Sequence, residues 1–189
     1  MQWYPSAKCF TEALASSEPT PGGGAAAAMA GAMGCALALM AIGTTLKRAS
    51  TPQKDLSPLQ NGLQRLQSLK AQLDTLIQQD SQAYASYLAA RKLPQQDSRR
   101  ASAIEEALWA AAKVPTDTAK TAVHCLQEID MIKESIAPVI ESDVLCAIHL
   151  LKACIRCAIE NIQANVAYIH NPEQKKKLEK DISDLLKAC

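Results

Sequence analysis

Residues 19–24 read Pro-Thr-Pro-Gly-Gly-Gly, and residues 25–34 continue without a charge as Ala-Ala-Ala-Ala-Met-Ala-Gly-Ala-Met-Gly. The two prolines stiffen the chain, the glycines allow a close approach to the backbone, and the alanine run starts a strong helix. The first turn of such a helix has unpaired N–H groups at the positive end of the helix dipole. The stretch therefore predicts either a tight turn into a small-residue helix or a site that a ligand can approach closely.

The composition of the 189 residues favours helices over sheets, because 48% are hydrophobic while only 4% are aromatic. The length is enough for one domain with a sizeable core, so we expect a single domain over residues 1–189. A formal net charge of +1 does not favour nucleic acid or an anionic membrane as a partner. The fold expected is an all-α, single-domain bundle of about six or seven helices.

The N-terminal residues 1–5 do not begin a secretory signal, since no basic region is followed by an apolar one. We therefore expect a cytoplasmic protein. Residues 25–46 carry no charge over a length that could span a bilayer, but Ala, Gly, Met and Thr partition weakly into lipid. We expect instead a helix buried by protein, in which Gly31 and Gly34 let another backbone come close, and no membrane partner.

Seven cysteines in a cytoplasmic chain indicate reduced thiols rather than a disulfide framework. Cys154 and Cys157, with Cys146 and His149 upstream, have a spacing compatible with a metal site. They lie in one helical pattern, however, and no second pair on a loop completes a tetrahedron. We expect small buried cysteines and no metal site.

Apolar spacing and capping residues predict six helices besides the buried one. The loop that follows the buried helix, residues 47–58, contains Lys47, Arg48 and Lys54, which suit either solvent or an anionic ligand tail. The helices are expected over residues 6–16, 59–93, 98–112 with an end at Val114-Pro115, 116–135 after a Thr116 or Asp117 cap, 142–170 after a Ser142-Asp143 cap, and from Asn171-Pro172 onward.

Asp80 lies on the apolar stripe of the long helix, between Ile77 and Tyr84. A buried carboxylate is costly unless it is paired or hydrogen-bonded, and burial raises its pKa. The position suits either proton transfer near neutral pH or a structural aspartate that a neighbouring donor satisfies.

Asn161 and Asn165 share a stripe with apolar residues of the helix that follows Ser142-Asp143, so two amides face the bundle. An amide both donates and accepts hydrogen bonds, as an amide of a substrate or the edge of a pterin ring requires. The same amides can instead make hydrogen bonds between helices that fix their register.

These features together resemble the cyclodeaminase/cyclohydrolase family, whose domain forms the C-terminal half of formiminotransferase-cyclodeaminase and also occurs alone. The shared features are the glycine loop and its helix, Asp80 with Ala83-Tyr84, Leu93-Pro94, Arg100, residues 107–115, Ser142-Asp143, and Asn161-Ile162 with Asn165. The glycine loop alone is a weak signal, whereas the ordered set is specific and runs through most of the chain.

The resemblance implies an all-α homodimer that binds a one-carbon derivative of tetrahydrofolate, with no cofactor beyond that substrate. Asp80 matches the catalytic aspartate of the family, and Gly22, Gly23 and Gly24 would line the folate site. Ser142, Asp143, Asn161 and Asn165 match the remaining substrate-binding positions.

Three functions follow as alternatives. The resemblance favours a formiminotetrahydrofolate cyclodeaminase that releases ammonia and forms methenyltetrahydrofolate. A methenyltetrahydrofolate cyclohydrolase would use the same aspartate as a base for water. A non-catalytic helical scaffold would use the polar core positions only to fix helix register.

Overall fold

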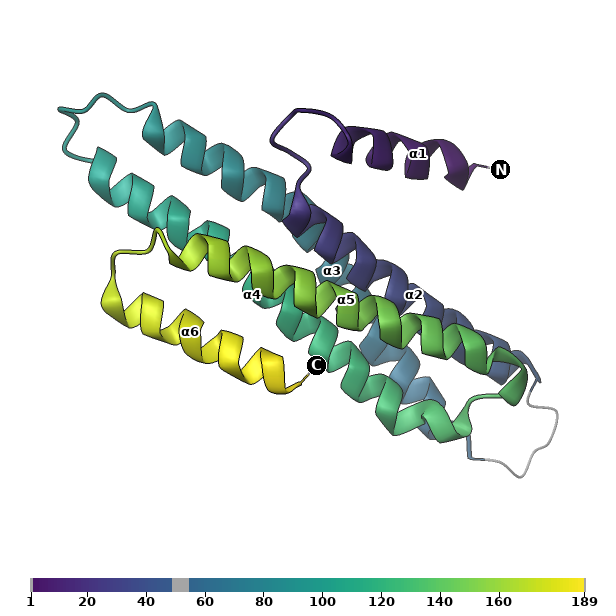
Figure 1. The fold of residues 1–189 in the computed structure, drawn as a ribbon. Helices are drawn as coiled ribbons and strands as arrows, with labels where there is room; N and C mark the ends of the chain where they lie inside the picture. Colours follow the sequence, from purple (N-terminus) through teal and green to yellow (C-terminus); the bar gives the residue numbers. More distant parts are fainter. Residues whose placement is uncertain (1, 49–54, 189) are drawn as a thin grey trace.

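A computed structural model describes residues 2–48 and 55–188 of the chain. Within these ranges the structure contains six α-helices, two short 3-10 helices and no strand (Figure 1). The all-α prediction is therefore confirmed, whereas the dimer stays a prediction. The helices are α1 (Trp3–Leu14), α2 (Gly23–Arg48), α3 (Ser57–Arg91), α4 (Arg100–Ile132), α5 (Glu141–Val166) and α6 (Pro172–Lys187).

Helices α2, α3, α4 and α5 pack together into an elongated bundle, in which α2 contacts the other three (Figure 1). Helix α6 packs on α4 and α5. Helix α1 lies beside the bundle and contains no buried residue. The core thus forms along α2, between the long helices on either side of it.

The small residues of α2 bring it close to α5, as predicted. A Cβ atom added to Gly34 would lie 2.9 Å from the carbonyl oxygen of Ala147 on α5. One added to Gly31 would lie 2.8 Å from the Sγ of Cys154. Among the described residues α2 is the only helix long and apolar enough to span a membrane, and 56% of its most apolar window is buried inside the protein.

The predicted helix end at Val114-Pro115 is wrong, because α4 runs through Pro115 without a break. Proline lacks an N–H and leaves the carbonyl four residues earlier without its helical donor. Here that carbonyl belongs to Ala111, and it accepts a hydrogen bond from Asn165 Nδ2 of α5 at 3.0 Å. A neighbouring helix therefore compensates the proline. Thr116 is buried inside α4 and bonds the Ala112 carbonyl rather than capping a new helix.

The ends of α5 also differ from the prediction. Ser142 and Asp143 lie inside its first turn rather than at its cap, because the 3-10 turn Pro138–Ile140 leads directly into the helix. The helix ends at Val166 and not at His170. The predicted start of α6 is confirmed: the side chain of Asn171 accepts hydrogen bonds from the backbone N–H groups of Glu173 and Gln174.

The structure describes six cysteines, of which Cys9 on α1 is exposed and the other five divide into two classes. Cys35, Cys125 and Cys154 are buried, as expected of small apolar residues. Cys146 and Cys157 are exposed, contrary to expectation, because they lie on the outer side of α5.

Candidate functional site

A cavity of about 430 Å³ lies where α2 begins. Helix α3 continues past this point (Figure 1), so the cavity is bounded by α3, α4 and α5 and closed at one end by the first turn of α2. It is lined by Pro19, Thr20, Gly22, Gly23, Gly24, Asp80, Ala83, Tyr84, Tyr87, Arg91, Leu108, Ala111, Asn161, Asn165 and Tyr168.

The side chain of Asp80 is joined to the first turn of α2. Its Oδ2 accepts a hydrogen bond of 2.9 Å from the backbone N–H of Ala25. A Cβ atom on Gly24 would lie 2.6 Å from Asp80 Cγ, so only glycine leaves room for the carboxylate there. The structure thus joins the glycine loop and Asp80, which the sequence patterns predicted as separate features: the start of α2 supplies both the N–H donor and the space for the carboxylate.

Two opposing effects set the pKa of Asp80. Desolvation by burial raises the pKa above the ordinary aspartate value, and the hydrogen bond from the Ala25 N–H partly offsets this rise. Burial dominates, so the pKa is raised overall. The carboxyl therefore holds a proton more readily than an exposed aspartate does, as a group that both accepts and delivers protons requires.

Asn161 places a second polar group beside the glycines. A Cβ atom on Gly23 would lie 3.3 Å from Asn161 Nδ2, so the amide packs directly on the loop. The Nδ2 donates to the Cys157 carbonyl within α5 at 2.8 Å. Its Oδ1 is thereby oriented as an acceptor at the cavity wall.

Asn165 has a structural role that the sequence left open. Its Nδ2 donates to the Ala111 carbonyl that Pro115 leaves without a helical donor. Of the two interpretations of Asn165, a ligand contact or a hydrogen bond between helices, the structure shows the second. Since Ala111 and Asn165 both line the cavity, this contact between α4 and α5 forms part of the cavity wall.

Four further lining residues were missed as site residues. Tyr84, Tyr87 and Arg91 follow Asp80 by four, seven and eleven residues, so they continue its stripe along α3. Tyr168 extends the line of Asn161 and Asn165 on the opposite side. The helical spacing is visible in the sequence, but a tyrosine at such a spacing also fits the buried apolar face of a helix.

Ser142 and Asp143 do not line this cavity. They lie in the first turn of α5, and Asn161 is eighteen residues after Asp143, which corresponds to about 27 Å along a helix. The structure therefore separates these two residues from the other predicted site residues within one copy of the chain. A role for them in substrate binding stays a prediction.

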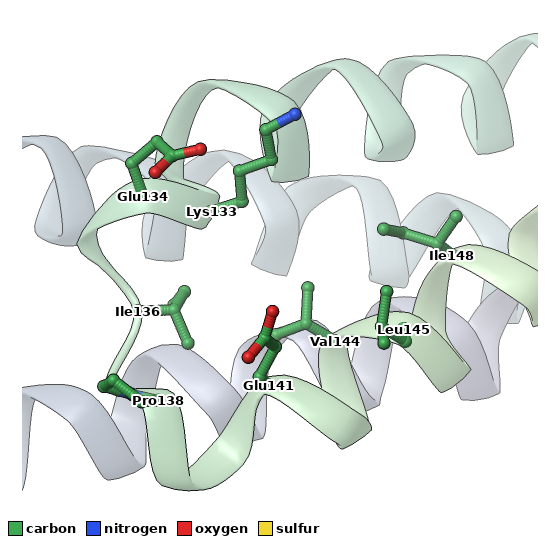
Figure 2. Close-up of a pocket in the computed structure, with 8 residues that line it drawn as sticks. All are labelled: Lys133, Glu134, Ile136, Pro138, Glu141, Val144, Leu145 and Ile148. Atoms are coloured by element: carbon green, nitrogen blue, oxygen red, sulfur yellow. The ribbon is translucent and has the colours of Figure 1, made fainter.

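A second cavity, of about 300 Å³, lies at the opposite end of the bundle, where α4 turns into α5 (Figure 2). Ile136, Val144 and Ile148 supply apolar surface, and the charged residues Lys133, Glu134 and Glu141 are all exposed. This cavity thus lacks the half-buried carboxylate and the paired amides of the first one. Lys47 and Arg48 lie at the far end of α2 from the glycines, and Lys54 lies outside the described residues.

Comparison with known proteins agrees with the arrangement of these residues. The chain is 29% identical over 181 residues to methenyltetrahydrofolate cyclohydrolase of Methylorubrum extorquens, covering 94% of this chain and 86% of that relative. It is 29% identical over 189 residues to formimidoyltransferase-cyclodeaminase of Sus scrofa, covering 96% of this chain but only 34% of that relative. The chain therefore spans about a third of the length of the formimidoyltransferase-cyclodeaminases that it matches.

The fold has a close counterpart among solved structures. The crystal structure of formiminotetrahydrofolate cyclodeaminase from Thermotoga maritima matches with a TM-score of 0.83 and 26% sequence identity, covering 95% of this chain and 87% of that one. The family model described as Formiminotransferase-cyclodeaminase matches residues 6–184. With the glycine loop, Asp80 and Asn161 gathered at one cavity, this match shows that the chain belongs to the formiminotransferase-cyclodeaminase family.

Proposed function

We propose that this chain is a formiminotetrahydrofolate cyclodeaminase, which converts formiminotetrahydrofolate to methenyltetrahydrofolate and ammonia. The observation that carries the proposal is the half-buried carboxylate of Asp80, which bonds the first turn of α2 inside a cavity large enough for a small ligand. Membership of the family and the name of the similar Thermotoga maritima protein support the choice of substrate.

In the proposed reaction the second folate nitrogen attacks the carbon of the protonated formimino group. The C–N bond that forms gives a tetrahedral carbon bearing three nitrogens. The Asp80 carboxylate takes the proton from the attacking nitrogen, and the same carboxyl delivers it to the departing amine. The bond to that amine then breaks, leaving ammonia and the methenyl cation. The raised pKa of Asp80 suits both halves of this transfer.

The remaining residues of the cavity have binding and positioning roles in this proposal. Gly22, Gly23 and Gly24 let the substrate approach the backbone, and the Asn161 amide offers an acceptor to the pterin edge. Such positioning accounts for much of the rate in reactions where two groups of one molecule must meet. The proposed steps use the tetrahydrofolate-derived substrate, with no further cofactor and no metal.

Methenyltetrahydrofolate cyclohydrolase is the second candidate. It is favoured by the Methylorubrum extorquens relative, which the chain matches over 86% of that protein's length. In that reaction Asp80 would take a proton from water as the water oxygen bonds the methenyl carbon, and the ring would then open to the formyl product. A scaffold without activity is not favoured, since a scaffold has no use for a carboxylate that burial destabilises.

The experiment offers the purified protein formiminotetrahydrofolate and, separately, methenyltetrahydrofolate, while the methenyl absorbance is followed. Appearance of the absorbance together with ammonia identifies the cyclodeaminase. Accelerated disappearance identifies the cyclohydrolase. If neither substrate is converted, the proposed activity is wrong.

Asp80→Asn tests the proton carrier in the same assay. Asparagine can still accept from the Ala25 N–H but cannot titrate, so we expect kcat to fall by about a hundredfold to ten-thousandfold while the helical content is retained. Asp74→Asn is the matched control, because Asp74 lies on the same helix in an exposed ion pair with Lys70. Equal turnover in both variants would remove Asp80 from the mechanism.

A further inference from the structure

The cavity continues outward from Asp80 along one face of α3. Tyr84, Tyr87 and Arg91 all line it and lie on the same helical stripe as Asp80. Tyr84 and Tyr168 are exposed although they are large aromatic residues. Two helices therefore present tyrosine rings to the open part of the cavity, while the carboxylate and the amides lie in its inner part.

Charge is distributed unevenly between these two parts. Asp80 is the only acidic residue that lines the cavity, and Arg91 is the only basic one, among the residues that the structure describes. In the same ranges Arg91 makes no ion pair, whereas Arg65 on the same helix is paired with Glu128 at 2.6 Å. The Arg91 guanidinium lies 5.8 Å from the centre of the Tyr87 ring instead.

The position of this guanidinium is set by the helix. Side chains of a helix lean toward its N-terminus, which places the Arg91 guanidinium over Tyr87, one turn back. Tyr87 follows Asp80 by seven residues, which corresponds to about 10 Å along the helix axis. The end of α3 is held by Arg100, whose Nε donates to the Leu93 carbonyl at 3.1 Å and whose Nη2 donates to the Arg91 carbonyl at 3.5 Å.

We propose that the outer part of this cavity is a subsite for an aryl amide that carries carboxylates, with Arg91 as its specificity-determining residue. The guanidinium binds a carboxylate, and Tyr84 and Tyr87 flank the aryl ring. This inference rests on the proposed function, since the aminobenzoylglutamate tail of a tetrahydrofolate has this chemistry. Its aryl amide is long enough to extend over the roughly 10 Å of helix axis between Asp80 and Tyr87, beside which the guanidinium lies.

The physical basis is the preference of arginine for carboxylates. The planar guanidinium presents two parallel N–H groups to a carboxylate, and its cation–π contact with the Tyr87 ring favours this position before a ligand arrives. Because Arg91 is exposed, water and salt weaken the attraction. We therefore expect a contribution of about fivefold to tenfold in affinity.

The first test measures binding of two fragments and needs no turnover. The fragments are para-aminobenzoylglutamate, which lacks the pterin, and methyltetrahydropterin, which lacks the tail. Arg91→Ala should weaken binding of para-aminobenzoylglutamate by about fivefold to tenfold and leave that of methyltetrahydropterin unchanged. Lys92→Ala is the matched control, because it removes a positive charge from the next residue, which does not line the cavity.

The second test uses the substrate that the parent converts. Arg91→Ala should raise KM by a similar factor and change kcat less, whereas Arg91→Lys should restore part of the affinity. If the parent converts the substrate but Arg91→Ala and Lys92→Ala behave alike in both tests, the tail subsite is wrong and the proposed function stands. If the parent binds para-aminobenzoylglutamate through Arg91 but converts neither folate, the subsite stands and the activity is wrong. If the parent binds neither fragment, the subsite is wrong whatever the assay of turnover gives.

Discussion

Two pairs of glycines in α2 have the same sequence character and opposite surroundings. In the first turn, Gly23 and Gly24 make room for the side chains of Asn161 and Asp80 at the cavity. In the middle of the helix, Gly34 makes room for the backbone of α5 at Ala147, and Gly31 for Cys154. The first pair leaves space for polar side chains, which can rotate. The second pair lets α2 pack closely on α5, and these two helices cannot move apart without disturbing the core. Small residues in one helix thus divide between the site and the core.

The largest effect is expected at Gly24. A methyl group added there would displace the Asp80 carboxylate, which lies at the end of a side chain and can rotate away. Gly24→Ala should therefore leave the bundle folded but lower kcat by about a hundredfold or more, comparable to loss of a general acid–base group. Circular dichroism and the folate assay measure the two properties on one sample.

Gly43→Ala is the control for this variant. It makes the same change in the same helix at a position where an added Cβ meets nothing within 4 Å. Its kcat should equal that of the parent. If Gly24→Ala retained the parent's kcat as well, the close approach of Gly24 and Asp80 would have no functional meaning.

A smaller effect, on stability rather than activity, is expected at Gly34. An added Cβ would lie 2.9 Å from the Ala147 carbonyl oxygen and 3.0 Å from Leu151 Cγ, so two helices would have to separate. Overpacking of this kind costs about 1–3 kcal/mol, partly offset by about 1 kcal/mol of helix propensity. In urea unfolding, Gly34→Ala should be less stable than the parent, and Gly43→Ala should be slightly more stable.

The turnover of the folded Gly34→Ala protein should match that of the parent. A selective loss of kcat in this variant would contradict the distinction between the two pairs of glycines.

The smallest effect concerns pH. Burial raises the pKa of Asp80, so the folded state binds its proton more tightly than the unfolded state does. The stability that this bound proton adds to the folded state is therefore fully present below the ordinary aspartate pKa. It is lost as the pH rises through the raised pKa of Asp80. The free energy of unfolding of the parent should fall relative to that of Asp80→Asn as the pH rises across this window. Cys154, which lies beside Gly31 in the middle of α2, does not titrate in this window, because burial raises its pKa to about 12.

Urea titrations at several pH values, with Asp74→Asn as the control, measure this difference. A gap between parent and Asp80→Asn that is constant with pH would show that the two states bind the Asp80 proton equally.

Local rules were enough to predict the glycine loop and Asp80. A proline-glycine run followed by alanines dictates a helix start with free N–H groups, and a carboxylate on an apolar stripe requires a donor. The structure joins the two through the Ala25 N–H. Tyr84 and Tyr87 could not be assigned to the cavity in this way, because a tyrosine at helical spacing fits a core and a cavity wall equally well.

The error at Pro115 has a different cause. The rule that proline ends a helix is local, and it fails when a distant side chain supplies the missing donor. Asn165 does this for the Ala111 carbonyl from another helix, which no pattern around Pro115 reveals. Ser142 and Asp143 were grouped with the site by resemblance, although the predicted helix over residues 142–170 already placed them about five turns before Asn161.

Helix α2 also has a consequence for synthesis of the protein. Among the described segments, only α2 has the length and the mean hydropathy, 2.0, of a membrane span. Much of its burial comes from α5, which begins only at Glu141. At translation rates of about 5–20 residues per second, α2 leaves the ribosome on the order of ten seconds before α5 is complete. During that time its apolar surface lacks the helix that covers it in the folded protein, so the nascent chain is most exposed to aggregation and to membranes before its last third has been made.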